Sequence, residues 1–171
     1  MIFEVSWEIQ ALGIITLVLY VAAMQMKKKE TLLVLQIFSN LFFVFQCLLT
    51  NSPTGVVITI VAIIRGFVFY LYKKRELNPN IAAFLIFQAA LIASTIFTWE
   101  SILSIFPFLA ASINLYGVWQ DKMKVLRILA IAACVFWMVY QFYAGMYAAM
   151  ITEICIIISS AIGLWKFRKT T

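Results

Sequence analysis

Long apolar runs, separated by short polar turns, fill almost the whole chain. Each run has the roughly 20-residue length that a helix needs to cross the hydrocarbon of a bilayer. The pattern predicts spans at about residues 8–26, 31–50, 54–72, 80–98, 101–119, 125–144 and 146–165. The last two runs are separated only by Ala144, Gly145 and Met146, yet a turn is required there. A single unbroken helix of about 40 residues would be far too long for the bilayer.

Composition places these helices in a membrane. Of the 171 residues, 65% are hydrophobic and 12% are charged, whereas soluble domains have roughly 45–50% apolar and about 25% charged residues. A chain of this length has no soluble core large enough to bury the excess. We therefore expect a polytopic all-α membrane protein in contact with the lipid bilayer, with no soluble domain. We expect no cleaved signal peptide, so the first helix would stay as an anchor.

The basic residues indicate the topology. Apart from Arg65, the Lys and Arg residues form four clusters: Lys27, Lys28 and Lys29; Lys73, Lys74 and Arg75; Lys122, Lys124 and Arg127; Lys166, Arg168 and Lys169. One span fits before the first cluster, and two fit between each successive pair. Basic residues of short loops stay in the cytoplasm, which predicts seven spans with the N-terminus outside and the C-terminus cytoplasmic. The net charge of +6 then reflects the topology, and the basic clusters can also bind anionic lipid headgroups. We therefore expect no nucleic-acid partner.

An internal repeat organises the seven spans. At a shift of 95 residues the first part of the chain matches the last part at five positions: Gln25, Lys27, Lys29, Val44 and Gln46 align with Gln120, Lys122, Lys124, Val139 and Gln141. This alignment predicts two parallel three-helix repeats, at residues 1–76 and 100–171, joined by a linker helix at residues 77–99. Parallel repeats of this kind are a known plan of transporters, whose substrate sites lie between the repeats near the midplane.

Two charged residues lie well inside predicted spans, away from the span ends: Arg65 and Glu153. A charge at the bilayer centre costs about 2.5–3.5 kcal/mol or more, so it marks a functional site by default. One interpretation is that both line a polar cavity that binds an anionic or zwitterionic solute, or a proton. The other is that Arg65 extends to the cytoplasmic headgroups and Glu153 is protonated or hydrogen-bonded within the bundle.

Further polar residues are candidates for the same site: Asn40, Gln46, Asn114 and Gln141. Each is also explained by interhelical hydrogen bonding. Trp137 lies deep in a span and suits either a stacking surface or the core, and Pro107 marks a helix that is either kinked or closely packed. The residues that are absent narrow the chemistry. There is no histidine, and the three cysteines all lie within spans, so we expect no metal site, no cofactor and no enzymatic activity.

Four segments together resemble one protein family: Pro107 to Tyr116, Ala62 to Arg65, Trp137 to Gly145, and Met150 to Glu153. They resemble the YgjV family of bacterial inner-membrane proteins over essentially the whole chain. That family is similar in architecture to the SWEET, PnuC and PQ-loop transporters, which share a three-plus-one-plus-three helix plan. The resemblance implies a multi-pass protein of the bacterial inner membrane with its N-terminus outside. It does not imply a substrate.

Three functions fit these observations. The first is a transporter or facilitator of a small polar solute, which works by alternating access between the two three-helix bundles. The second is a membrane receptor that binds without transport, and the third is an accessory subunit that binds a partner. A homo-oligomer is compatible with each of them.

Overall fold

Helices begin and end where apolar runs meet polar turns. A computed structural model gives the positions of residues 7–99, 101–120 and 122–167, and no strand occurs in these ranges. The helices are α1 (Trp7–Gln25), α2 (Lys29–Leu49), α3 (Pro53–Lys74), α4 (Ile81–Phe97), α5 (Ile105–Trp119), α6 (Met123–Tyr143) and α7 (Tyr147–Phe167), with a short 3₁₀ turn, η1 (Ile102–Ser104), before α5. The predicted bounds agree to within a few residues. The largest difference is at α5, because η1 occupies the expected first turn.

Local chemistry explains several of these boundaries. Pro53 is at the first position of α3, where a missing N–H costs no helical hydrogen bond. The side chain of Asn80 accepts a hydrogen bond from the Ala82 N–H at 3.1 Å and so caps α4. Between α6 and α7, Gly145 has a φ of 72°, a left-handed conformation that glycine adopts without steric cost. The required turn between the last two spans is therefore present.

Five of the helices are long and apolar enough to cross a membrane: α2, α3, α6, the η1–α5 segment (Ile102–Trp119) and most of α7 (Ala149–Lys166). The other two candidates are shorter apolar stretches, at Ala11–Gln25 in α1 and at Ile81–Phe97 in α4. Many large apolar side chains on the outside of the bundle are exposed, among them Ile86, Phe97 and Ile102. Such exposed apolar side chains are expected on helices that are surrounded by lipid rather than by water. An all-helical membrane protein is confirmed, and crossing by α1 and α4 remains a prediction.

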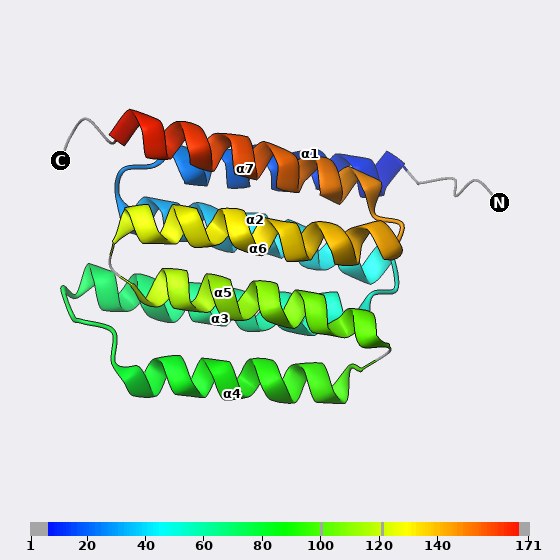
Figure 1. Ribbon diagram of the computed structural model, residues 1–171, viewed down its shortest axis with the longest axis horizontal. Helices are drawn as coiled ribbons and strands as arrows, with labels where there is room; N and C mark the ends of the chain where they lie inside the picture. Colours follow the sequence, from blue (N-terminus) through cyan, green and yellow to red (C-terminus); the bar gives the residue numbers. More distant parts are fainter. Residues whose placement is uncertain (1–6, 100, 121, 168–171) are drawn as a thin grey trace.

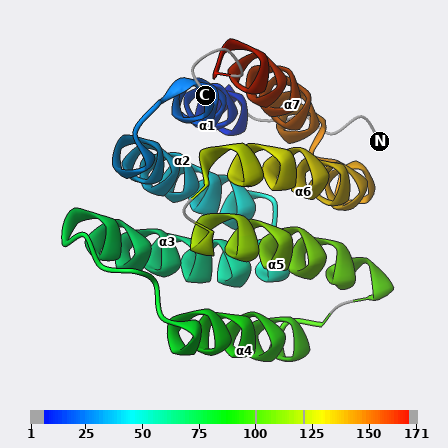
Figure 2. The same cartoon turned by 60° about the vertical axis from the view of Figure 1, so that its left-hand side comes forward.

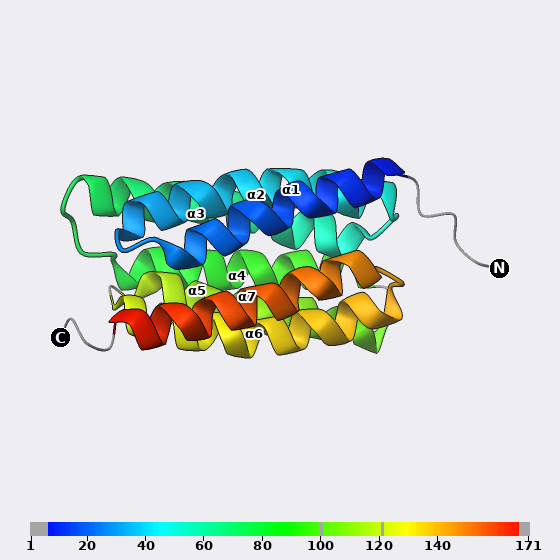
Figure 3. The same cartoon turned by 90° about the horizontal axis from the view of Figure 1, so that it is seen from above.

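The helices pack as two layers of three, with one helix added at the edge. Figure 1 shows α1, α2 and α3 behind α7, α6 and α5, and Figure 3 shows the two layers from above. Within each layer neighbours in sequence pack together, and the layers are joined by contacts of α1 with α7 and of α3 with α5. These contacts close six helices into a ring. The remaining helix, α4, packs outside the ring against α3 and α5 (Figure 2).

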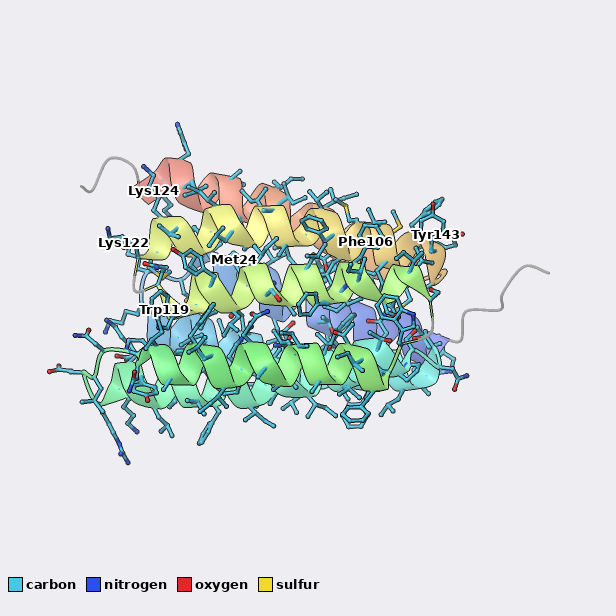
Figure 4. The ribbon with its side chains drawn as sticks, turned by 60° about the horizontal axis from the view of Figure 1, so that its bottom comes forward. Met24, Phe106, Trp119, Lys122, Lys124 and Tyr143 are labelled. Carbon is cyan, nitrogen blue, oxygen red and sulfur yellow. The ribbon has the colours of Figure 1, made fainter. Side chains whose placement is uncertain are left out.

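The basic clusters gather at one end of the bundle, called here the basic end. It comprises the α1–α2, α3–α4 and α5–α6 turns together with the last turn of α7 (Figure 1). In Figure 4, Lys122 and Lys124 lie at this end, and Phe106 and Tyr143 lie toward the other. The predicted segregation of charge along the bundle axis is thus present in the described residues, whereas Arg168 and Lys169 of the fourth cluster lie outside them.

Candidate functional site

A cavity lies inside the six-helix ring. Its empty space amounts to about 770 Å³, including the part that opens to solvent. Every helix of the ring contributes to the wall, and α4 contributes nothing. The lining residues are Thr16 and Tyr20 of α1; Gln36, Asn40, Phe43 and Gln46 of α2; Ile58, Thr59, Ala62 and Arg65 of α3; Ala111 and Asn114 of α5; Cys134, Trp137 and Gln141 of α6; and Ala149, Thr152, Glu153 and Ile156 of α7.

All seven residues that the sequence predicts for a binding site line this one cavity: Asn40, Gln46, Arg65, Asn114, Trp137, Gln141 and Glu153. They come from five different helices, so only the packing of the ring brings them together. The eighth candidate, Pro107, does not line it. This residue is buried in the first turn of α5, where a proline removes no helical hydrogen bond, and α5 continues unbroken to Trp119.

Arg65 points into the bundle rather than toward the headgroups. Only 7% of its surface is exposed, and its Nη1 donates a hydrogen bond to the carbonyl oxygen of Ala111 at 3.3 Å. Its Nε has no hydrogen-bond partner. Because a guanidinium has five N–H donors, this single bond within the described chain leaves most of its donor capacity unused. An acceptor in the cavity would use that capacity.

Glu153 has a different set of neighbours. Its Oε1 accepts a hydrogen bond from Nε2 of Gln141 at 3.1 Å, and Cys134 of α6 lines the same cavity. The other atom of the Gln141 amide, Oε1, is buried without a partner. Among the lining residues, Gln141 and Glu153 therefore have unused acceptors, whereas Arg65 has unused donors.

Arg65 and Glu153 line the same cavity but do not form an ion pair. Both α3 and α7 begin at the end of the bundle opposite the basic end (Figure 1). Arg65 follows the first residue of α3, Pro53, by about 18 Å along the helix axis, and Glu153 follows the first residue of α7, Tyr147, by about 9 Å. The two residues consequently lie at different depths along the bundle axis.

Further polar contacts lie between α1 and α2. Nε2 of Gln36 donates to the Tyr20 hydroxyl at 3.2 Å, and the Ser39 hydroxyl donates to the Thr16 carbonyl at 2.9 Å. The Thr16 hydroxyl itself is buried without a partner. Sequence reasoning missed Thr16 and Tyr20 as site residues. Their four-residue spacing, which matches that of Gln36 and Asn40 on the next helix, was the available signal.

Trp137 belongs both to the cavity wall and to the packed core. Its ring meets Phe43 edge-on, with centroids 5.7 Å apart and an interplanar angle of 88°, and it also contacts Tyr140 at 6.1 Å. Both Phe43 and Trp137 line the cavity. The ring thus packs against other aromatic side chains at the cavity wall, and its role as a stacking surface remains a prediction. Among the described residues, no group of three or more His, Cys, Asp or Glu side chains could hold a metal ion.

Hydrogen bonds join the two layers at the basic end. Nζ of Lys29 donates to the Gln120 carbonyl at 2.9 Å. Arg127 donates from Nε to the Met24 carbonyl at 3.2 Å and from Nη2 to the Met26 carbonyl at 2.9 Å. These carbonyls lie where α1 and α5 end, and cations are favourable there because helices end in unpaired, partly negative C=O groups. We call these bonds of Lys29 and Arg127 the basic-end links.

The cavity comes much closer to the opposite end. Gln141 is in the last turn of α6, which ends at Tyr143, and Ala149 is in the first turn of α7. Gln46 is similarly near the end of α2. The structure thus combines a linked basic end with a polar cavity displaced toward the other end.

Comparison with known proteins places the chain in a family. The model of the Imp-YgjV family, described as bacterial inner membrane protein, matches residues 7–171. No curated protein and no solved structure matches significantly. The match covers nearly the whole chain and agrees with its apolar helices and its charge segregation. The chain belongs to the Imp-YgjV family and is a multi-pass protein of the bacterial inner membrane.

Proposed function

We propose that the protein carries a small polar solute across the inner membrane by alternating access. The observation that supports this most is the cavity lined by polar residues of six helices, among which Arg65, Gln141 and Thr16 each have a buried polar atom without a partner. Buried polar groups in native proteins are almost always satisfied, so each exception needs an explanation. A polar solute that occupies the cavity for part of a transport cycle provides one.

Two parallel repeats would be the moving units. If α1, α2 and α3 correspond to α5, α6 and α7, the contacts within the first three helices recur within the last three. The contact of α1 with α7 then corresponds to the contact of α5 with α3. Gln46 and Gln141, which the sequence repeat aligns, both line the cavity. In this proposal α4 is the linker that restores the orientation of the second repeat, as in the three-plus-one-plus-three plan of SWEET-like transporters. No enzymatic step is needed.

The basic end is the proposed cytoplasmic side, since basic loops stay in the cytoplasm. The basic-end links join the layer of α1–α3 to the layer of α5–α7. Rocking of one layer against the other would break them and open the cavity to the cytoplasm. This conformation would then be the one closed on the cytoplasmic side.

A thermal-shift screen of the purified, detergent-solubilised protein tests for a ligand, with sugars, amino acids, vitamins and organic acids as probes. A ligand that binds only the folded state adds about 2.7 kcal/mol at a hundredfold excess over its Kd. Each hit is then tested for counterflow in proteoliposomes. We expect Arg65→Gln and Glu153→Gln to abolish both the shift and the counterflow.

The matched controls are Arg75→Gln and Glu76→Gln, which change the same residue types at exposed positions after α3 and should leave both measurements unchanged. Normal counterflow in both cavity variants would show that the site is assigned wrongly. Tight binding without counterflow would favour the receptor function instead. A protein that is stable only when co-expressed with a partner would favour the accessory function.

A further inference from the structure

We infer that the ligand of the cavity is a zwitterion, with its anionic group at Arg65 and its ammonium group at Glu153. This inference rests on the proposed function in taking the cavity as a solute site. It goes further by naming the chemical class of the solute. Three features of the described residues carry it: the donor set at Arg65, the acceptor set at Glu153, and the separation of the two charges.

The Arg65 end of the cavity requires an acceptor. Nη1 is bonded to the Ala111 carbonyl, and Nε has no partner. Nε and Nη2 form the edge through which a guanidinium binds a carboxylate with two parallel hydrogen bonds, and no bond of the described chain occupies that edge. Asn114, one turn along α5 from Ala111, supplies a neutral amide to the same cavity. A carboxylate satisfies the charge and the geometry together.

The Glu153 end requires a donor. Gln141 already gives its Nε2 to Glu153, which leaves its own Oε1 as a buried acceptor without a partner. Glu153 adds the remaining acceptor sites of its carboxylate. An ammonium group, with three donors and a positive charge, can serve both residues at once.

The separation of the two charges favours one molecule that carries both groups. Arg65 and Glu153 are 7% and 9% exposed and are not paired with each other, so the Arg65 guanidinium and an ionised Glu153 carboxylate each have no counter-ion among the described residues. Leaving a buried charge uncompensated costs several kcal/mol. A simple anion would compensate only Arg65, and a simple cation only Glu153. A zwitterion compensates both and adds no net charge to the cavity.

The competing arrangement is an anion that binds Arg65 while a proton neutralises Glu153. The two arrangements make opposite predictions for Glu153→Gln, which mimics a protonated carboxyl. If the ligand is a zwitterion, the variant loses the partner of the ammonium group. If the ligand is an anion that travels with a proton, the variant retains binding.

The test measures thermal shifts of the full-length protein in detergent with a panel of α- and ω-amino acids from glycine to 6-aminohexanoate. Each amino acid is paired with the carboxylate that lacks its amine and the amine that lacks its carboxylate. We expect at least one amino acid to raise the Tm of the wild type, while neither matched probe does so at the same concentration. In Glu153→Gln its affinity should fall about 10- to 100-fold, the worth of a charged hydrogen bond.

Glu153→Asp keeps the charge and serves as the second variant if Glu153→Gln does not yield a monodisperse protein. It should retain part of the amino-acid shift. The inference is overturned if no amino acid in the panel shifts the Tm, or if a matched carboxylate shifts it equally and still does so in Glu153→Gln.

A counterflow measurement distinguishes failure of this inference from failure of the proposed function. Transport of a solute that is not a zwitterion overturns only the inference, whereas zwitterion binding without counterflow overturns only transport.

Discussion

Three of the turns between helices place a residue in the left-handed region of backbone conformation. Glu76, between α3 and α4 at the basic end, has a φ of 54°, and the other two residues lie at the opposite end of the bundle. Asn51, between α2 and α3, has a φ of 51°, and Gly145, between α6 and α7, has a φ of 72°. Asparagine tolerates this region better than other residues with a Cβ, and glycine adopts it freely. The tight turns at this end of the bundle therefore depend on the identity of single residues.

At Gly145 the strain can be measured without interference from packing, because an added Cβ would meet no atom within 4 Å. We expect Gly145→Ala to lower the free energy of unfolding by about 1 kcal/mol, the cost of a left-handed residue with a Cβ. Thermal unfolding in detergent measures the change, with Asn51→Gly as the matched control. The control should keep its stability within about 0.5 kcal/mol. Equal melting temperatures for Gly145→Ala and the wild type would contradict the assigned turn conformation.

The candidate site shows what single residues reveal before the packing is known. The sequence identifies Arg65 and Glu153 because a charge in hydrocarbon is costly wherever it lies. It does not distinguish Gln36 from Gln88, since both are amides in the middle of a span. The packing separates them: Gln36 lines the cavity and bonds to Tyr20, whereas Gln88 bonds to Ser112 across the α4–α5 contact at 3.0 Å.

Threonines give an even weaker signal. The Thr59 hydroxyl lines the cavity, yet it donates to the Gly55 carbonyl in its own helix at 2.6 Å. Thr95 makes the same kind of bond to Leu91 in α4, away from the cavity. Because any threonine in a span can satisfy itself in this way, its presence does not predict a site.

At the scale of elements, the ends of helices are well predicted, because an apolar run must stop where water or headgroups begin. Which helices meet is much harder to predict, since lipid-facing and partner-facing sides of a span are both apolar. The contact of α7 with α1 is an example. It brings Gly163 so close to α1 that an added Cβ would lie 3.2 Å from the Met24 carbonyl and 2.8 Å from Nε of Arg127.

This close approach makes the basic-end links testable. Gly163→Ala would displace Arg127 and weaken its bonds to α1, as would Arg127→Ala directly. In a background of Cys47→Ala and Cys155→Ala, the remaining Cys134 lines the cavity. We expect both changes to accelerate its modification by a membrane-impermeant thiol reagent applied from the cytoplasmic side. A loss of about 1 kcal/mol corresponds to about a fivefold faster reaction.

Gly117→Ala is the control for Gly163→Ala, because a Cβ there would make ordinary contacts, the nearest at 3.4 Å from Leu129 Cβ. Inside-out and right-side-out vesicles separate the two sides of the membrane. Unchanged labelling rates from the cytoplasmic side in both Arg127→Ala and Gly163→Ala would show that the basic-end links do not limit access to the cavity.

At the scale of the whole molecule, the chain crosses the bundle an odd number of times between the start of α1 and the end of α7. These two positions therefore lie at opposite ends of the bundle (Figure 1). All the basic turns lie at the end where α7 finishes, and basic loops stay in the cytoplasm. The molecule should therefore lie in the inner membrane with the start of α1 on the periplasmic side.

Reporter fusions test this orientation. A fluorescent protein fused after Thr171 should mature and fluoresce in the cytoplasm, and alkaline phosphatase inserted at Gly145 should be active in the periplasm. The same phosphatase placed at Asn78, in the turn before α4, is the control and should be inactive. An active enzyme at Asn78 together with an inactive one at Gly145 would invert the topology and place the basic end outside.

The peripheral position of α4 has an evolutionary consequence. Six helices are constrained on one side by the ring and its cavity, whereas α4 lines no part of the cavity and packs against α3 and α5 at the edge of the ring. Its outer side chains, such as Leu85 and Ile86 at 58% and 66% exposed, need only remain apolar. Homologous chains should therefore diverge fastest along this face of α4. In a family alignment, the substitution rate should be higher there than at the cavity-lining positions of the six helices in the ring.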